Sequence, residues 1–147
     1  MGALVAVLHL TLILTFSFYL RQRYSWDAKI FWPALVIKLL AGICLGLLYL
    51  YYFEVGDTFV YFRDGAKLAA LAGSDLSSYF GLVVADRGLE SAELVLMEPR
   101  ALFFTKLTSV LNIVTGINYW AIGFHYSFIS FLGSWFLVSV IRFNIRT

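Results

Sequence analysis

The chain has 147 residues, of which 61% are hydrophobic and only 14% are charged. A soluble domain is nearer one half apolar, so this composition excludes a soluble domain and predicts an integral membrane protein. The formal net charge of +2 includes no long basic run, which gives no reason to expect a nucleic-acid partner. With Cys44 as its single cysteine, the chain can form neither a disulfide framework nor a cysteine metal site.

Three apolar segments are long enough to cross the bilayer as helices, and they cover residues 3–20, 30–53 and 119–141. The first has about 18 residues, just enough for a hydrocarbon core of about 30 Å. A secretory signal peptide is the competing interpretation of this segment. No basic region precedes it, Arg21 and Arg23 follow it, and no small-residue cleavage site is present. The sequence therefore predicts an all-α membrane protein with three transmembrane helices in a single membrane domain.

The charges between the spans predict their orientation. Arg21, Arg23 and Lys29 outweigh Asp27 in the first connector, and the positive-inside rule places such a connector in the cytoplasm. The segment 54–118 has eight acidic and five basic side chains, which agrees with an outer location. We therefore predict a multi-pass protein of the cell's inner (plasma) membrane. Its N-terminus and loop 54–118 lie outside, and its C-terminus lies in the cytoplasm.

The outer loop is expected to fold onto the membrane face as amphipathic interfacial helices, because no proline- or serine-rich tract marks it as a linker. Periodicity predicts a helix over 58–72, and Gly73-Ser74-Asp75 ends it and can cap a short helix that follows. Pro99 restarts helical structure, residues 101–114 have the pattern of a helix lying in the interface, and Thr115-Gly116 ends it. Residues 81–97 stay undecided between short helices and strands. The polar side of the second interfacial helix consists of Thr105, Thr108, Ser109 and Asn112.

Two carboxylates, Glu54 and Asp57, stand where the second span runs into the outer loop. The aromatic cluster Tyr49 to Phe53 directly before them is typical of the headgroup level. A partly desolvated carboxylate at the rim of a helix bundle can take a proton from a hydroxyl or hold a divalent cation, Mg or Mn. Asp57 is equally a natural helix N-cap, and both roles can hold at once. Asp57 is therefore the first candidate for catalysis and for metal binding, and Glu54 is the second candidate for catalysis.

Three basic residues of the outer loop, Arg63, Arg100 and Lys106, are candidates for binding a phosphate group at the interface. Solvated surface charge is the alternative role for each of them. The sequence contains no glycine-rich nucleotide loop, no HExxH motif and no nucleophile elbow. Soluble nucleotide chemistry is therefore not supported.

Small residues recur on two spans at spacings that let helices approach closely. Gly42 and Gly46 form a GxxxG pair in the second span. The third span carries a stripe of Gly123, Ser127, Ser130 and Ser134. These patterns predict helix packing, with further transmembrane helices or a second copy of the chain as partners.

Two polar side chains lie inside the spans. Lys38 is expected to extend its ammonium group to the headgroups, and His125 is expected to make a packing hydrogen bond. An ion-pair or phosphate role for Lys38, and a proton-carrying or ligand role for His125, are the alternatives. A transporter that uses both residues is the least favoured function, because they lie at different depths.

Several short motifs along the chain carry a resemblance to a known class of proteins. They are Lys38-Leu39-Leu40, Tyr49 to Phe53, Gly56-Asp57-Thr58, Tyr61-Phe62, Asn118-Tyr119-Trp120 and Ser130-Phe131-Leu132-Gly133. Together they resemble the N-terminal portion of polytopic bacterial membrane proteins related to the GT-C class of glycosyltransferases. The resemblance implies sugar transfer from a polyprenyl-phosphate donor at the outer face, with Asp57 as base or metal ligand. The alternative function is a small non-catalytic membrane subunit that acts in assembly through helix packing.

Overall fold

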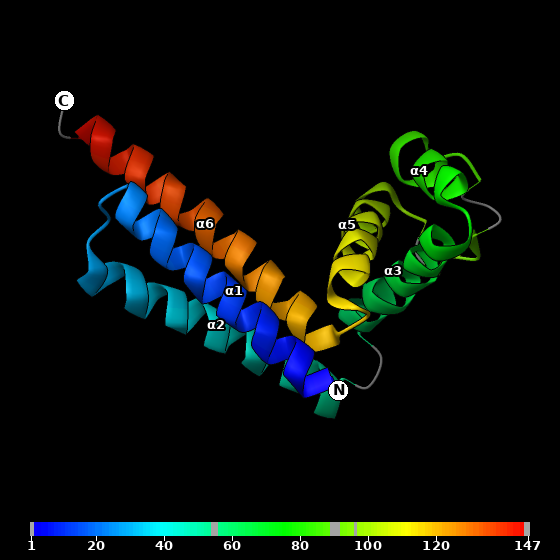
Figure 1. Ribbon diagram of the computed structural model, residues 1–147, viewed down its shortest axis with the longest axis horizontal. Coiled ribbons are helices and arrows are strands. Elements are labelled where there is room, and N and C mark those ends of the chain that lie inside the picture. Colours follow the sequence, from blue (N-terminus) through cyan, green and yellow to red (C-terminus); the bar gives the residue numbers. More distant parts are fainter. Residues whose placement is uncertain (1, 54–55, 89–91, 96, 146–147) are drawn as a thin grey trace.

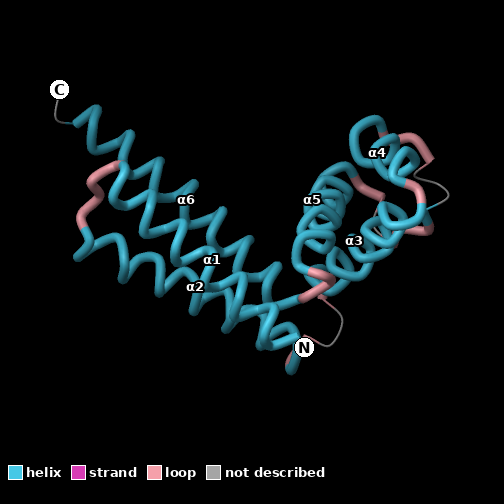
Figure 2. The backbone as a smooth tube through the Cα atoms, in the orientation of Figure 1, coloured by secondary structure: helices cyan, strands magenta, loops and turns pink. Residues whose placement is uncertain are grey.

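The computed structural model describes residues 2–53, 56–88, 92–95 and 97–145, and this part of the chain is helical without any strand (Figures 1 and 2). The long helices are α1 (Gly2–Arg23), α2 (Ala28–Tyr51) and α6 (Tyr119–Ile145). The first two and Tyr119–Ile141 of the third are long and apolar enough to cross a membrane. The expected all-α fold with three candidate membrane spans is therefore confirmed.

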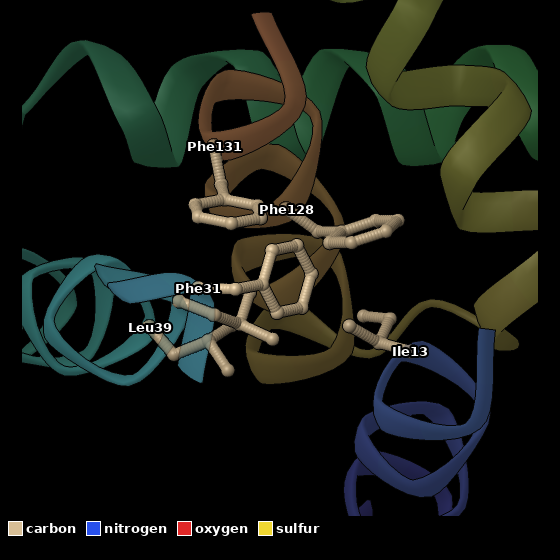
Figure 3. Packing of buried hydrophobic residues seen from close by; sticks show 6 residues of the cluster. Ile13, Phe31, Leu39, Phe128 and Phe131 are labelled. Atoms are coloured by element: carbon tan, nitrogen blue, oxygen red, sulfur yellow. The ribbon is translucent and has the colours of Figure 1, made fainter. Parts of the chain in front are cut away.

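The three long helices lie side by side in an elongated group, here called the bundle (Figure 1). Both α1 and α2 pack against α6, which is the central helix. Only 22%, 11% and 17% of the most apolar windows of α1, α2 and α6 are buried inside the protein. Helices that are apolar and still mostly exposed fit a lipid surrounding. The core shown in Figure 3 joins all three helices through Ile13, Phe31, Leu35, Leu39, Phe128 and Phe131.

The contacts at the two ends of the bundle fix the direction of each helix. At one end the Asn118 side-chain amide donates a hydrogen bond to the Gly2 carbonyl over 2.7 Å. At the other end the Trp26 ring packs 5.7 Å from Trp135, between ring centroids. Hence α1 and α6 run in the same direction and α2 runs against both. The start of α1, the end of α2 and the start of α6 share one end of the bundle.

The polar middle of the chain forms a second helical group, here called the arm, which leaves that end of the bundle at an angle (Figure 1). It contains α3 (Asp57–Ser74), α4 (Leu76–Ala85) and α5 (Pro99–Thr115). α3 packs along α5 and also against α4. Of the segment left undecided by the sequence, Leu82 to Val84 belongs to α4, and Leu94 and Val95 lie in a loop.

Two helix-end signals in the arm act as the sequence predicts. The Asp75 carboxylate caps α4 by accepting the backbone N–H of Ser78 over 3.0 Å. Gly116 ends α5 with a φ of 61°, in the left-handed region that glycine adopts without steric cost. The predicted N-cap of α3 is displaced by one residue. Gly56 is the N-cap, and Asp57, the residue expected in that role, is the first residue of the helix.

The prediction for α5 is wrong about which face meets water. The polar stripe of an interfacial helix should be wet, but Thr105, Thr108, Ser109 and Asn112 are at most 2% exposed. The opposite side is open instead, with Phe103 at 62% and Val114 at 60%. The physical reason is that α3 covers the polar side of α5.

Candidate functional site

A cavity of about 310 Å³ lies where the arm joins the bundle. It is bordered by the last turns of α2, the start of α3, the middle of α5 and the start of α6. Small-molecule pockets begin at about 300 Å³ and are lined mainly by apolar and aromatic groups. The aromatic lining of this cavity consists of Tyr49, Tyr61, Phe62, Phe104, Tyr119, Trp120 and Tyr126.

The glycine pair of α2 forms part of the cavity wall and also holds α2 close to α6. A Cβ added at Gly46 would lie 3.0 Å from the Trp120 ring, and one added at Gly42 would overlap the Ser127 hydroxyl. Both glycines, and Ser127 opposite them, are therefore used for packing within this chain.

The other small residues of the α6 stripe have different surroundings. Gly123 borders the cavity, and within the described part of the chain no heavy atom beyond the adjoining stretch of α6 lies within 4 Å of where its Cβ would be. Ser130 and Ser134 are exposed on α6, and the Ser134 hydroxyl donates to the Ser130 carbonyl over 3.0 Å. The structure therefore divides the predicted stripe into a packed part and an open part.

Hydroxyl groups supply the polar part of the cavity wall. The hydroxyls of Thr108 and Tyr126 are hydrogen-bonded to one another over 2.7 Å, which links α5 to α6. The Thr58 hydroxyl is buried, and it has no hydrogen-bond partner among the described residues. A buried hydroxyl without a partner carries an unfavourable desolvation cost, so a polar group of a ligand would be stabilised here. No pattern in the sequence marks these hydroxyls as parts of one site, because the helices that carry them meet only in the folded chain.

Asp57 directly precedes Thr58 in the first turn of α3, and it is not itself one of the described residues that border the cavity. Its side chain is exposed, and no hydrogen bond or ion pair of Asp57 occurs within the described part of the chain. A carboxylate in the first turn is favoured by the positive end of the helix dipole. The turn into α3 is fixed by Gly56, where any Cβ would overlap the Tyr49 ring. Glu54 lies outside the described residues.

The three basic candidates do not gather around Asp57. Arg63 is exposed on α3, about 200° around the helix from the cavity residue Tyr61 at 100° per residue. Arg100 is in the first turn of α5, and Lys106 forms an ion pair with Asp86.

The contacts between α3 and α5 show how far Arg100 lies from Asp57. Asn112 donates to the Phe62 carbonyl, and three residues further along α3 a Cβ added at Gly65 would lie 2.9 Å from the methyl group of Thr108, which precedes Asn112 on α5. The two helices therefore run in opposite directions, which puts Arg100 at the far end of the arm. The distance is on the order of 20 Å, from a rise of about 1.5 Å per residue.

Metal-binding groups are sparse in the part of the chain that the structure describes. No three His, Cys, Asp or Glu side chains are grouped there so that they could hold a metal ion. Mg²⁺ is often bound by one or two carboxylates together with substrate phosphates. A divalent cation at Asp57 would therefore need a bound phosphate to complete its ligands.

His125 makes the packing hydrogen bond that the sequence analysis favours. Its Nε2 lies 3.0 Å from Nδ1 of His9, across the contact between α1 and α6. The two rings are T-shaped with centroids 5.1 Å apart. Lys38 is half-buried in a groove between α2 and α6, away from this pair.

Comparison with known proteins identified no relative. No family model, no curated protein and no solved structure matches this chain.

Proposed function

We propose that this chain is the membrane-embedded part of a glycosyltransferase-like protein that uses a lipid-phosphate sugar donor at the outer face of the inner membrane. In this proposal the arm end of the bundle is outside, as the basic first connector favours, and the arm helices lie at the membrane surface. The observation that carries the proposal is the position of an exposed carboxylate, Asp57, directly beside Thr58 of an aromatic cavity.

The cavity would bind the part of the donor's hydrocarbon chain that is nearest its phosphate. Aromatic and glycine residues of α2 and α6 provide an apolar wall for such a chain. The start of α3 would lie near the phosphate, because the first backbone N–H groups of a helix are free and attract anions. The hydroxyl of Thr58 could donate a further hydrogen bond to the same group.

In the transfer step Asp57 acts as general base. Its carboxylate takes the proton of an acceptor hydroxyl, and the acceptor oxygen forms a bond to C1 of the donor sugar. The bond between C1 and the phosphate oxygen breaks, and the lipid phosphate leaves with the electron pair. If Asp57 instead holds Mg or Mn, the cation would neutralise charge on the leaving phosphate. In either case the proposal depends on Asp57 and the cavity, and it does not require Arg63, Arg100 or Lys106.

The test is to replace the carboxylate in the full-length chain. Asp57→Asn is expected to lower transfer of radiolabelled hexose from a polyprenyl-phosphate hexose by about 10²-fold or more. Asp75→Asn is the matched control, because it removes another exposed carboxylate at a helix start of the same arm. Circular dichroism of the reconstituted protein checks that both variants fold. Full transfer by Asp57→Asn would refute the proposed role.

The alternative, a non-catalytic subunit that assembles through helix packing, is supported by Ser130 and Ser134, which are exposed on the membrane-spanning α6. Gly42 and Gly46 are less suited to this role because they already pack within the chain. Ser130→Leu should then dissociate an oligomer in detergent, measured by light scattering after size-exclusion chromatography. An unchanged oligomer would count against this alternative.

A further inference from the structure

The exposed side of α5 is a continuous apolar stripe. Phe103, Val110 and Val114 are spaced at i, i+7 and i+11, so they share one face of α5, and Ile117 follows in the turn after the helix. Their exposed fractions are 62%, 44%, 60% and 51%. Of the charged residues of α5, Arg100 is exposed in the first turn, before the stripe begins, and Lys106 lies at the edge of the stripe, where it forms an ion pair with Asp86. A soluble helix would turn such a face into the protein, which α5 does not do.

The buried side of α5 uses its polar groups for contacts with three other helices. The Ser109 hydroxyl lies 3.0 Å from the Tyr79 hydroxyl of α4, and the Asn112 amide donates to a carbonyl of α3 over 3.2 Å. The Thr108 hydroxyl is bonded to Tyr126 of α6. At Gly65 of α3 an added Cβ would lie only 2.9 Å from the Thr108 methyl group.

This arrangement is the one that helices adopt in a membrane. In lipid, small residues allow close approach and polar side chains bond between helices, while large apolar side chains face outward. The hydrophobic effect contributes less to the contact between α3 and α5 than to an ordinary helix contact, because the most buried α5 side chains are hydroxyls and an amide. If the apolar stripe faced water, the contact between α3 and α5 would lack a strong driving force.

We infer that the apolar stripe of α5 is inserted into the hydrocarbon of the bilayer leaflet that surrounds the arm end of α6, and that α3 covers α5 on the water side. Only Gly116, Ile117 and Asn118 separate α5 from α6, so the stripe continues directly into a membrane-spanning helix. α5 packs against α6 and α1, and Figure 1 shows it on the side of the arm nearer the bundle. The exposed charged side chains Arg63 and Lys67 belong to α3.

The length of the stripe sets how it lies. From Phe103 to Val114 it extends about 17 Å at a rise of about 1.5 Å per residue, which is too short for a hydrocarbon core of about 30 Å. α5 is therefore a layer of one leaflet and not a fourth span. The inference depends on the three long helices being in a bilayer, and it is independent of sugar transfer.

The experiment compares one labelled position on the stripe with one on α3. In full-length protein with Cys44→Ala, a single cysteine is placed at Val114 or, as a matched control, at Ala70, which is exposed on α3 of the same arm. Each is labelled with the environment-sensitive fluorophore NBD and reconstituted in phosphatidylcholine vesicles. The label at Val114 should show blue-shifted emission that doxyl-labelled lipid quenches and aqueous iodide does not. The label at Ala70 should show the reverse.

Two results would overturn the inference. Equal quenching of both labels by iodide would place the stripe in water. A label at Val114 that is shielded from both quenchers would show that protein, for example a second copy of the chain, covers the stripe. Val110→Cys repeats the measurement on the same face if Val114→Cys does not fold, with helical content as the criterion. None of these results depends on transfer activity, so they leave the test of Asp57 separate.

Discussion

The contact between Gly42 and Ser127 predicts that one methyl group will measurably separate α2 from α6. In Gly42→Ala the new Cβ would overlap the Ser127 hydroxyl oxygen and lie 3.2 Å from the Ser127 Cβ. Ser127 is 9% exposed and sits beside the core residue Phe128, so the helices have little room to adjust. Overpacking of this kind costs about 1–3 kcal/mol. The ratio of folded to unfolded protein should fall by about 5- to 150-fold, at about 1.4 kcal/mol per factor of 10. Rotation of the Ser127 side chain to another rotamer would move the cost toward the lower limit.

The assay is reversible unfolding in mixed micelles, titrated with dodecyl sulfate and followed by circular dichroism. Gly133→Ala is the control, because among the described residues no heavy atom beyond the adjoining stretch of α6 lies within 4 Å of its added Cβ. Each variant exchanges one glycine for alanine inside a long helix, Gly42 in α2 and Gly133 in α6. Both therefore gain the same intrinsic helix propensity, and the difference between their unfolding free energies reports the overlap with Ser127 alone. Ser127→Ala deletes the atom that overlaps, and the double variant Gly42→Ala/Ser127→Ala should recover most of the lost stability. The coupling energy between the two sites should then exceed about 0.5 kcal/mol. Equal stability of Gly42→Ala and Gly133→Ala, or strict additivity in the double variant, would refute the close contact.

Two further predictions concern carboxylates of the arm. Asp64 is buried, and its carboxylate accepts the Val95 backbone N–H over 2.8 Å. Asp64→Ala should therefore lower the free energy of unfolding by about 1.5–3 kcal/mol and speed hydrogen exchange at the Val95 amide. Unchanged protection of that amide would contradict the hydrogen bond. The pKa of Asp75 lies below its ordinary value of 3.8, because the Ser78 hydroxyl and then the Ser78 backbone N–H donate to the carboxylate. A lowered folded-state pKa stabilises the start of α4 at pH above 3.8, and this contribution is lost as the pH falls through the folded value. A pH titration of the Asp75 carboxyl carbon-13 signal should therefore have its midpoint below pH 3.8, and Ser78→Ala should raise that midpoint. A midpoint at or above pH 3.8 in the unsubstituted protein would contradict the hydrogen bonds.

The sequence by itself determined the features that depend on neighbouring residues. Apolar runs of span length predicted the three long helices, because hydropathy and a rise of about 1.5 Å per residue are local properties. Asp75 and Gly116 marked helix ends for the same reason, since a cap needs only backbone groups within one turn. Asp57 was placed at the start of a helix to within one residue.

The tertiary structure alone decided what lies against each helix. The 3.6-residue period shows that Thr108 and Asn112 share a face of α5, but the same period fits a face turned to water or to α3. The hydrogen bond between His9 and His125 joins residues 116 positions apart. The cavity likewise brings together residues that are far apart in the chain, because its walls come from four helices. A pattern within one helix records which side chains lie together, and only the packing of the helices shows what covers them.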